Sequence, residues 1–443
     1  MRQSIYGFFI FLLTAPWAVP ALAQTTPTVS SISADVVSFS DPLSSVVTFA
    51  VTGTDLDGMV YSGYSLWLGE FQGIVEGGNA TSMTFSFTVR PASLPSGDYP
   101  LTIQLAGTQV YTSEPIVHVV NIFSLIPDRK STQKYLEDVP LKKMSKKRLG
   151  LNVHYALGGS EAEDATLEAR LRRSKTKWMR EHFSHEALMG EDQAAWFARY
   201  DKAMQFAADN NIHVVGMLAY GLVGDDYSRP SKEEWETFVD LTVNRYKHVV
   251  DAWEVWNEPD SPDYLDPSTV KNYVKLLKQA SPIIRRNDPE AVILGGVLAS
   301  PNADWAEEIF DQAGNAFDQL ALHVYQCENW LNNGNLQQLD KDWTAVGQVV
   351  RRHRPEVKVW VTELGCSEGS SGVGEKEQRQ SMKKITQYLL NTGSVEVVLL
   401  YTIRDRSFLE ESDPYEAYFG LLNADFSPKL VWDWYRQIRV NTQ

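Results

Sequence analysis

From Arg148 onward, short apolar runs alternate with longer segments in which apolar residues recur at helical spacing. The short runs have the length of strands and the longer segments the length of helices, so the pattern predicts a repeated strand–helix unit. The predicted strands are Leu149–Tyr155, Lys177–Phe183, Ile212–Leu218, Val250–Trp256, Ala291–Val297, Leu320–Tyr325, Val357–Glu363 and Val395–Tyr401. The predicted helices are Ala165–Ser174, Gln193–Asn210, Lys232–Lys247, Pro267–Arg286, Asn302–Ala313, Lys341–Arg352, Glu375–Asn391 and Leu430–Val440.

Strands that alternate with helices predict a parallel sheet, and eight such units in residues 148–443 fit a (β/α)8 TIM barrel. An open, doubly wound α/β sheet is the structural alternative. It has less support, because no glycine-rich phosphate loop follows the first predicted strand. In a barrel, catalytic residues lie at the carboxyl ends of the strands, so these ends are where chemistry is expected.

Residues 24–120 follow a different pattern, in which short β-rich runs are separated by turn-forming Gly, Pro, Asn and Asp residues. The runs are Val46–Val51, Tyr64–Leu68, Ser82–Val89, Tyr99–Leu105 and Ile116–Val120. This spacing predicts an all-β, Ig-like sandwich domain ahead of the barrel. The segment Leu94–Ile103 resembles the penultimate hairpin of bacterial Ig-like domains. The domain either supports the barrel or binds carbohydrate, and support is favoured because no cluster of exposed aromatic residues stands out.

Residues 1–23 have the pattern of a signal peptide. Arg2 gives a positive start, Phe8–Leu13 is the apolar centre, and Ala21-Leu22-Ala23 fits a small-x-small cleavage site. We expect cleavage before Gln24 and export to the periplasm or the exterior, with no stable membrane insertion of the mature chain. An uncleaved anchor is the alternative, but the apolar run is short for a full membrane span.

Composition narrows the range of partners. The 443 residues are 43% hydrophobic and 22% charged, as in a globular protein, and the formal net charge is −15. This acidity argues against nucleic acid, so the basic run in Lys142–Arg148, at the end of a predicted linker over 121–147, is interpreted as solvated. Aromatic residues make up 11% of the chain, which fits core packing and sugar-stacking surfaces equally. No cofactor is expected, and a monomer is favoured.

Polar residues gather at the predicted strand ends. They are Asn152 and His154 on the first strand, Arg180, Glu181, His182 and His185 on the second, Tyr220 on the third, Asn257 and Glu258 on the fourth, Ser300 on the fifth, His323 and Tyr325 on the sixth, Thr362 and Glu363 on the seventh, and Tyr401, Arg404 and Asp405 on the eighth. Tyr220 and Ser300 are unremarkable at their strand ends, although the segment Tyr220–Tyr227 is a candidate wall of a cleft. Because strand ends meet at one face of a barrel, the other side chains are candidates for one site.

Two carboxylates stand out, because Glu258 and Glu363 each close a long apolar run. Opposed carboxyl groups suit glycosidic cleavage, in which one protonates the leaving oxygen and the other attacks or stabilises the sugar cation. Arg180 is a candidate partner that keeps Glu363 ionised, and Glu258 beside Trp256 is a candidate acid with a raised pKa. The alternative is that each Glu serves a helix start or an ion pair.

The barrel segment resembles the retaining glycoside hydrolases of clan A, and within that clan family 39 and its relatives. The segment Trp256-Asn257-Glu258-Pro259 matches the acid/base motif of the fourth strand, and Val361-Thr362-Glu363-Leu364-Gly365 matches the nucleophile motif of the seventh. His323-Val324-Tyr325 matches the His-x-Tyr of the sixth strand. Gly420-Leu421-Leu422, with Asp425 and Pro428-Lys429, resembles the segment that leads into the last helix.

The resemblance implies a role for each matching residue. Glu258 would be the acid/base, Glu363 the nucleophile, and Asn257 a partner of the sugar 2-hydroxyl. The remaining roles are that Arg180 and Tyr325 orient Glu363, and that His154 and His323 line the first subsite. The family usually places a Trp platform on the eighth strand, where this chain has Tyr401, so the stacking surface differs here. The chain also carries its β-domain before the barrel rather than after it.

Cys327 and Cys366 are the two cysteines, and they follow neighbouring predicted strands. Export would permit a disulfide between them, whereas a zinc site built from both cysteines and His323 is the weaker alternative. The main functional hypothesis is an exported retaining glycosidase acting on a polysaccharide or oligosaccharide, such as an exopolysaccharide. A catalytically inactive sugar-binding protein and an inverting hydrolase are the alternatives.

Overall fold

The computed structural model describes two parts of the chain. Backbone is described for the strands between Thr28 and Asn121, and the second part comprises residues 136 and 142–440 without 158, 191, 221–228, 328–330, 332 and 370–372. The predicted signal peptide lies outside the described residues. The chain forms two compact units, the first made largely of residues up to Val119 and the second largely of Val120–Gln443, and each is described by itself.

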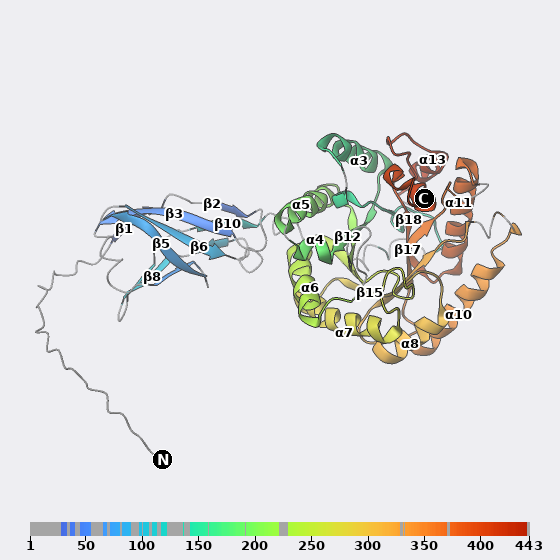
Figure 1. Cartoon of the computed structure of the whole chain (residues 1–443), viewed down its shortest axis with the longest axis horizontal. Helices are drawn as coiled ribbons and strands as arrows, with labels where there is room; N and C mark the ends of the chain where they lie inside the picture. The colour runs from blue at the N-terminus through green and yellow to red at the C-terminus, as the bar shows by residue number, and fades with distance from the viewer. Residues whose placement is uncertain are drawn as a thin grey trace, which may run out of the picture. The chain divides into compact units, whose positions relative to one another are not determined.

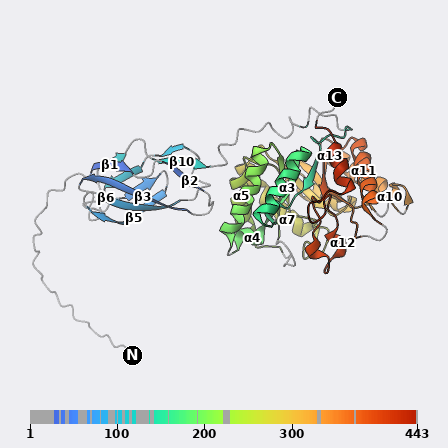
Figure 2. The ribbon, with the colours of Figure 1, turned by 90° about the horizontal axis from the view of Figure 1, so that it is seen from above.

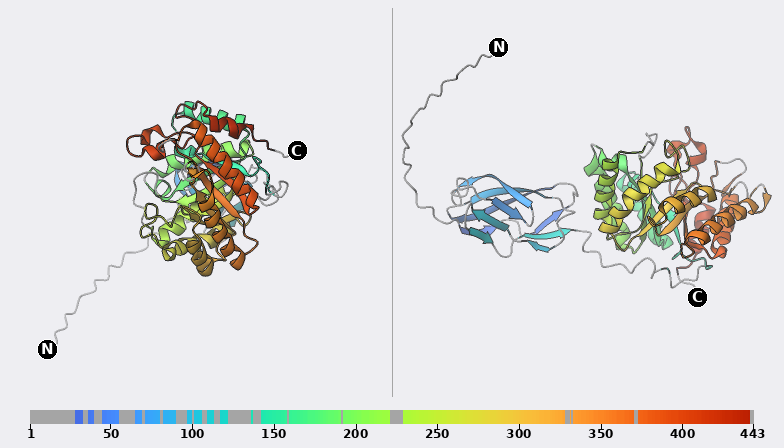
Figure 3. Two further views of the ribbon diagram at one scale, coloured as in Figure 1. Left: turned by 90° about the vertical axis from the view of Figure 1, so that its right-hand side faces the viewer. Right: turned by 90° about the horizontal axis from the view of Figure 1, so that it is seen from below.

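The first unit contains two β-sheets (Figure 3). Its strands are β1 (Thr28–Ile32), β2 (Val36–Phe39), β3 (Ser45–Thr54), β4 (Ser65–Leu68), β5 (Phe71–Asn79), β6 (Ser82–Val89), β7 (Gly97–Tyr99), β8 (Leu101–Leu105), β9 (Gln109–Thr112) and β10 (Val117–Asn121). The larger sheet has the order β1-β3-β6-β5-β4-β8-β9, and the smaller has β2-β10-β7. The sequence analysis missed β1, β2, β5 and β9, and in β5 three glycines weaken the strand pattern. The Ig-like assignment itself stays a prediction.

The second unit is built on a closed barrel of parallel strands, which confirms the predicted barrel and rules out the open sheet. The strands are β11 (Leu149–Asn152), β12 (Trp178–Ser184), β13 (His213–Ala219), β14 (Val250–Val255), β15 (Val292–Leu298), β16 (Gln319–Val324), β17 (Val359–Gly365) and β18 (Val395–Tyr401). Each strand pairs with the next in sequence, and β18 pairs with β11 to close the ring. Every predicted strand is present within a few residues of its predicted bounds.

Helices surround the barrel and follow one another in chain order (Figure 1). They are α3 (Glu161–Ser174), α4 (His185–Met189), α5 (Gln193–Asp209), α6 (Lys232–Tyr246), α7 (Val270–Asn287), α8 (Ala303–Ala313), α10 (Gln337–His353), α11 (Glu375–Thr392), α12 (Pro414–Ala417) and α13 (Leu430–Gln437). The short helices α4 and α12 were not predicted. Both follow the carboxyl end of a barrel strand and lie at the same end of the barrel (Figure 2).

Helix starts depend on capping that the apolar period alone does not reveal. Helix α3 begins at Glu161, earlier than predicted, because Ser160 and Glu163 form a capping box. Helix α7 begins at Val270 rather than Pro267, because the Thr269 side chain caps it. Helix α10 begins at Gln337, four residues before the predicted Lys341.

Large aromatic side chains fill the core of the second unit. Trp178, Trp253 and Trp360 on barrel strands are buried, and the rings of Trp178 and Trp360 meet edge to face with centroids 5.3 Å apart. Trp235 on α6 and Trp256 after β14 are buried as well. For the described part of the chain, much of the aromatic content therefore serves packing rather than an exposed sugar-binding surface.

The basic run before the barrel is not wholly solvated, contrary to the prediction. Lys146 is buried, and its ammonium lies 4.3 Å from the centre of the Tyr435 ring. Burial lowers the pKa of Lys146 to about 7. Arg148 is also buried and donates hydrogen bonds to the carbonyl oxygens of Leu136 and Glu396. This segment therefore packs against the amino-terminal end of the barrel. Within the described residues, no helix has the length and apolarity needed to span a bilayer.

Candidate active site

Glu258 follows the end of β14, where the backbone adopts an unusual conformation. Strand β14 is buried along its whole length, and Trp256 and Glu258 then adopt left-handed conformations with φ of 70° and 43°. The backbone N–H of Glu258 donates to the carbonyl of Val297 at 2.9 Å, and the Trp256 indole donates to the carbonyl of Tyr264 at 2.8 Å. Non-glycine residues in this region are strained, and such strain is concentrated at functional sites.

Glu363 is placed by an irregularity in the barrel. The register of β17 shifts against β16 between Leu322 and His323, and against β18 between Val361 and Leu364. Bulges of this kind redirect side chains near active sites. Here His323 becomes the register partner of Glu363. The Glu363 side chain is 9% exposed, so it is largely shielded from solvent.

Arg180 on β12 joins four strand ends. Its guanidinium donates to Glu363 Oε1 at 2.5 Å and to Glu254 Oε2 at 2.5 Å. It also donates to the side-chain oxygens of Asn152 and Asn257, each at 2.9 Å. Burial alone would lower the pKa of Arg180, but the charges of Glu254 and Glu363 outweigh it and raise the pKa. A buried cation held by two carboxylates fixes the position of Glu363.

His323 lies between the two carboxylates. Its Nδ1 is 2.6 Å from Glu258 Oε1 and 3.6 Å from Glu363 Oε2. One oxygen of each carboxylate and a nitrogen of His323 all lie within 4.8 Å of one another. The Tyr325 hydroxyl donates to Glu363 Oε2. Glu363 therefore receives hydrogen bonds from Arg180 and Tyr325, whereas Glu258 has His323 as its partner.

The two carboxylates have opposite pKa shifts. Burial raises the pKa of Glu258, although the hydrogen bond from His323 opposes this shift. Burial would also raise the pKa of Glu363, but the charges of His323 and Arg180, together with the hydrogen bonds from Tyr325 and Arg180, hold it below its ordinary value. These opposite shifts favour the protonated form of Glu258 and the ionised form of Glu363.

Residues 230–435 match the family model described as "Glycosyl hydrolase catalytic core". These residues are similar to a glycosyl hydrolase catalytic core. The predicted resemblance to glycoside hydrolases is thereby confirmed. A beta-xylosidase from Caldicellulosiruptor saccharolyticus is 32% identical over 108 residues, and the match spans 22% of this chain and 22% of that relative.

Solved structures are similar to this chain in fold. A monomeric beta-xylosidase from Caulobacter crescentus CB15 matches at 16% identity and a TM-score of 0.52, over 67% of this chain and 68% of that one. A GH39 enzyme from Xanthomonas axonopodis pv. citri matches at 17% identity and a TM-score of 0.51, over 67% of this chain and 66% of that one. At these identities the likeness establishes the fold alone.

Two residues of the site were underrated by the sequence analysis. Tyr220 accepts a hydrogen bond from the Asn257 amide at 2.7 Å, so both ends of that amide are engaged. Glu254 is fully buried within β14 and shares Arg180 with Glu363. A carboxylate inside an otherwise apolar strand was the available signal for Glu254, because an ion is rarely buried without a partner.

His154 and Tyr401 form another wall beside Glu363. The rings of His154 and Tyr401 meet edge to face, with centroids 5.8 Å apart, and Tyr401 meets Tyr325 at 6.1 Å. Both ring nitrogens of His154 are buried and have no hydrogen-bond partner among the described residues. Burial lowers the pKa of His154, and it lowers the pKa of His182 to about 3. Both rings are therefore neutral at neutral pH. Tyr401 stands edge-on to its neighbours rather than as an open platform.

Two residues predicted at the eighth strand end have structural partners instead. Arg404 pairs with Glu163 at 3.1 Å, and Asp405 pairs with the buried Lys429. The chain turns after Tyr401, so these side chains leave the centre of the barrel, and Arg406 takes the place beside Tyr401. The expectation that Arg404 and Asp405 contribute to the site is therefore not supported by their contacts.

Cys327 and Cys366 form a disulfide, with Cα atoms 5.3 Å apart. It joins the segments that follow β16 and β17. Because both sulfur atoms are bonded to each other, the alternative of a zinc site on these cysteines and His323 is wrong. The cluster of Glu258, His323 and Glu363 has the spacing of metal ligands, but its oxygen atoms already accept hydrogen bonds from Arg180, Tyr325 and His323.

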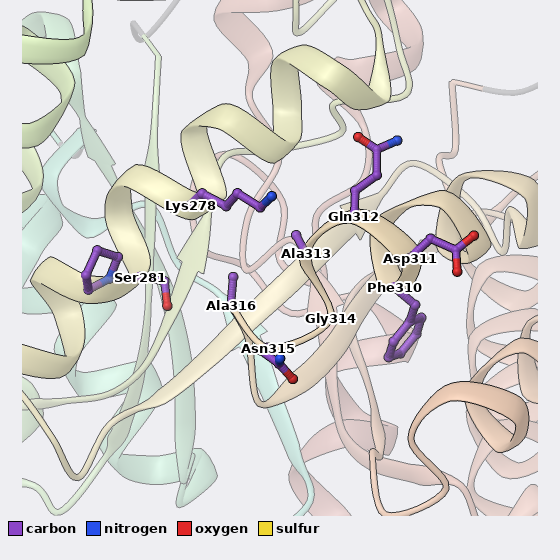
Figure 4. A pocket seen from close by; sticks show the side chains of 10 residues that line it. Lys278, Ser281, Phe310, Asp311, Gln312, Ala313, Gly314, Asn315 and Ala316 are labelled. Carbon is purple, nitrogen blue, oxygen red and sulfur yellow. The ribbon is translucent and has the colours of Figure 1, made fainter.

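A cavity of about 410 Å³ lies between α7 and the end of α8, away from these residues. Lys278 extends from α7 toward the end of α8, and Phe310 and Asp311 lie on the opposite side (Figure 4). The lining residues up to Ala316 precede β16 and therefore lie at the amino-terminal end of the barrel. The carboxylate pair lies at the other end.

Proposed function

We propose that the protein is an exported retaining glycoside hydrolase that cleaves O-glycosidic bonds in a polysaccharide or its fragments. The observation that carries this proposal is the pair formed by Glu258 and Glu363, with oxygen atoms within 4.8 Å and opposite pKa shifts. Retaining enzymes hold their carboxyl groups roughly 5–5.5 Å apart, whereas inverting enzymes hold them roughly 6.5–9.5 Å apart. The close spacing favours retention.

The proposed reaction is a double displacement. Glu363 attacks the anomeric carbon while Glu258 gives its proton to the departing oxygen, and a covalent glycosyl-enzyme forms. Glu258, now ionised, then removes a proton from a water molecule that attacks the same carbon and releases Glu363. His323 remains hydrogen-bonded to Glu258 and Arg180 to Glu363, so each carboxylate keeps its orientation through both steps.

Several features support a carbohydrate substrate. The family match and the curated beta-xylosidase relative favour a glycoside. The proposed export rests on the pattern of residues 1–23, and an exopolysaccharide would suit an exported enzyme. Asn257, held by Arg180 and Tyr220, is proposed to meet the sugar 2-hydroxyl, and His154 to line the first subsite.

Changing Glu258 to Gln tests the acid role through the leaving group. We expect hydrolysis of nitrophenyl glycosides and polysaccharide to fall by about 100-fold or more, because general acid assistance contributes roughly 10²–10⁴-fold. The first step on dinitrophenyl glycosides should be nearly unaffected, since that leaving group departs without a proton. Burst kinetics and reducing-end release measure both. Equal losses on both aryl glycosides would contradict the assignment of Glu258 as the acid.

A further inference from the structure

Arg406 and Glu416 form an ion pair beside the nucleophile that neither the sequence motifs nor the proposed mechanism uses. Nη1 of Arg406 is 3.2 Å from Glu416 Oε1, and the side chains are 20% and 27% exposed. The Arg406 guanidinium lies 5.8 Å from the centre of the Tyr401 ring. Arg406 follows β18 and Glu416 lies in α12, so the pair is at the catalytic end of the barrel.

The pair is incompletely satisfied by the protein. Both hydrogen bonds to Glu416, from Arg406 and from the Tyr401 hydroxyl, fall on Oε1. Among the described residues, no group donates to Oε2 of Glu416, and Nη2 and Nε of Arg406 have no acceptor. The two nitrogens of His154, whose ring also contacts Tyr401, lack partners among the described residues too. Because both side chains are partly exposed at the catalytic end of the barrel, these donors and acceptors are available to a ligand that both donates and accepts hydrogen bonds.

The pair is also coupled to the catalytic carboxylate. The charge of Glu363 acts on both Arg406 and Glu416, which places the pair within electrostatic range of the reaction. Tyr401, held by Glu416, packs edge to face against Tyr325, which donates to Glu363. A ligand held by the pair would therefore lie against the same wall as the sugar at Glu363.

We propose that Arg406 and Glu416 are specificity-determining residues that together bind adjacent hydroxyl groups of the sugar next to Glu363. A sugar hydroxyl both donates and accepts, so one hydroxyl can accept from Arg406 while its neighbour donates to Glu416. This inference rests on the proposed glycosidase function, because it names what the same site recognises.

The charge balance favours a neutral sugar at this wall. Arg180 is already shared by Glu254 and Glu363, which leaves Arg406 as the nearby cation, and Glu416 offsets it. A uronate carboxylate would add a negative charge beside Glu363 and Glu416, where the described cations Arg180 and Arg406 already have carboxylate partners. Partial burial raises the pKa of Glu416 to about 7, although the charge of Arg406 opposes this shift.

The test compares the effect of each substitution on substrates that carry or lack the hydroxyl group that the residue is proposed to bind. Wild type, Glu416→Gln and Arg406→Gln are compared on nitrophenyl xyloside, glucoside, mannoside and glucuronide, and on deoxy analogues of the best substrate. We expect each variant to raise KM by about 10- to 100-fold with a smaller change in kcat, as expected for one charged hydrogen bond. On the analogue that lacks the contacted hydroxyl, variant and wild type should differ little. Arg404→Gln, which removes a nearby ion pair with Glu163, is the matched control and should leave KM unchanged.

Two results would overturn the inference. One is a Glu416→Gln or Arg406→Gln protein whose losses are the same on every deoxy analogue, because that indicates a general structural defect. The other is a wild-type preference for the glucuronide. Binding of the same glycosides to the Glu363→Gln protein, followed by calorimetry, separates this inference from the proposed function. Binding that depends on Glu416 without any turnover by wild type would contradict the glycosidase function but would support a role of Glu416 in binding the sugar.

Discussion

Glu363→Gln is expected to lower kcat by about 10⁴-fold or more on every glycoside that the protein cleaves. The amide has nearly the same shape as the carboxylate, but it cannot attack the anomeric carbon to form the covalent intermediate. Tyr325 can still donate to the side-chain oxygen, so the fold should be retained. Steady-state kinetics and the near-ultraviolet circular dichroism of the folded protein measure the two effects.

Glu396→Gln is the matched control for this substitution. Glu396 lies on β18, the strand next to β17, and it pairs with Arg148 near the amino-terminal end of the barrel. The same chemical change there should leave kcat unchanged. A Glu363→Gln protein that keeps wild-type turnover on all cleaved glycosides would contradict the role of Glu363.

Arg180→Met should have the second largest effect, because it leaves two buried carboxylates without their cation. Removing one partner of a buried ion pair typically costs about 3–5 kcal/mol of folding free energy. Arg180 helps to hold the pKa of Glu363 below its ordinary value, so its loss should raise that pKa. The nucleophile must be ionised, so the acidic limb of the kcat/KM profile should move to higher pH. Denaturant titration and a pH–rate profile are the measurements.

Arg148→Met is the control that distinguishes a loss of folding stability from a change in the pKa of Glu363. Arg148 is buried as well, but it pairs with Glu396 at the other end of the barrel. We expect this control to lose stability and to keep the pH profile of the wild type. In wild type, the raised pKa of Glu258 should set the alkaline limb, since the acid must be protonated, and the lowered pKa of Glu363 the acidic limb. If Arg180→Met leaves the acidic limb in place, Arg180 does not tune the nucleophile.

The barrel and its carboxylate pair could be predicted from the sequence because both follow from local patterns. Buried parallel strands appear as apolar runs, and Glu258 and Glu363 each stand where such a run ends. The register shifts that turn Glu363 toward His323 depend on how neighbouring strands pair, which no local pattern shows. Helix starts at Glu161 and Gln337 were missed for a related reason, because they depend on capping or loop geometry rather than apolar period.

The remaining site residues depend on tertiary contacts. Glu254 looked like one charge in an apolar strand, and only the barrel brings it to Arg180. Glu416 lies in a helix of four residues within the segment after β18, where sequence pattern is weakest. The turn after Tyr401 decides that Arg406, not Arg404, lies beside that ring, and a shift of two residues cannot be read from composition.

The most direct test of the double displacement is the configuration of the first sugar released. Proton NMR can follow a β-linked aryl glycoside that wild type cleaves, before the product mutarotates. The close spacing of Glu258 and Glu363 predicts that the β-anomer appears first and the α-anomer only later. Initial release of the α-anomer would contradict the account, because it would require water to attack directly from the opposite face.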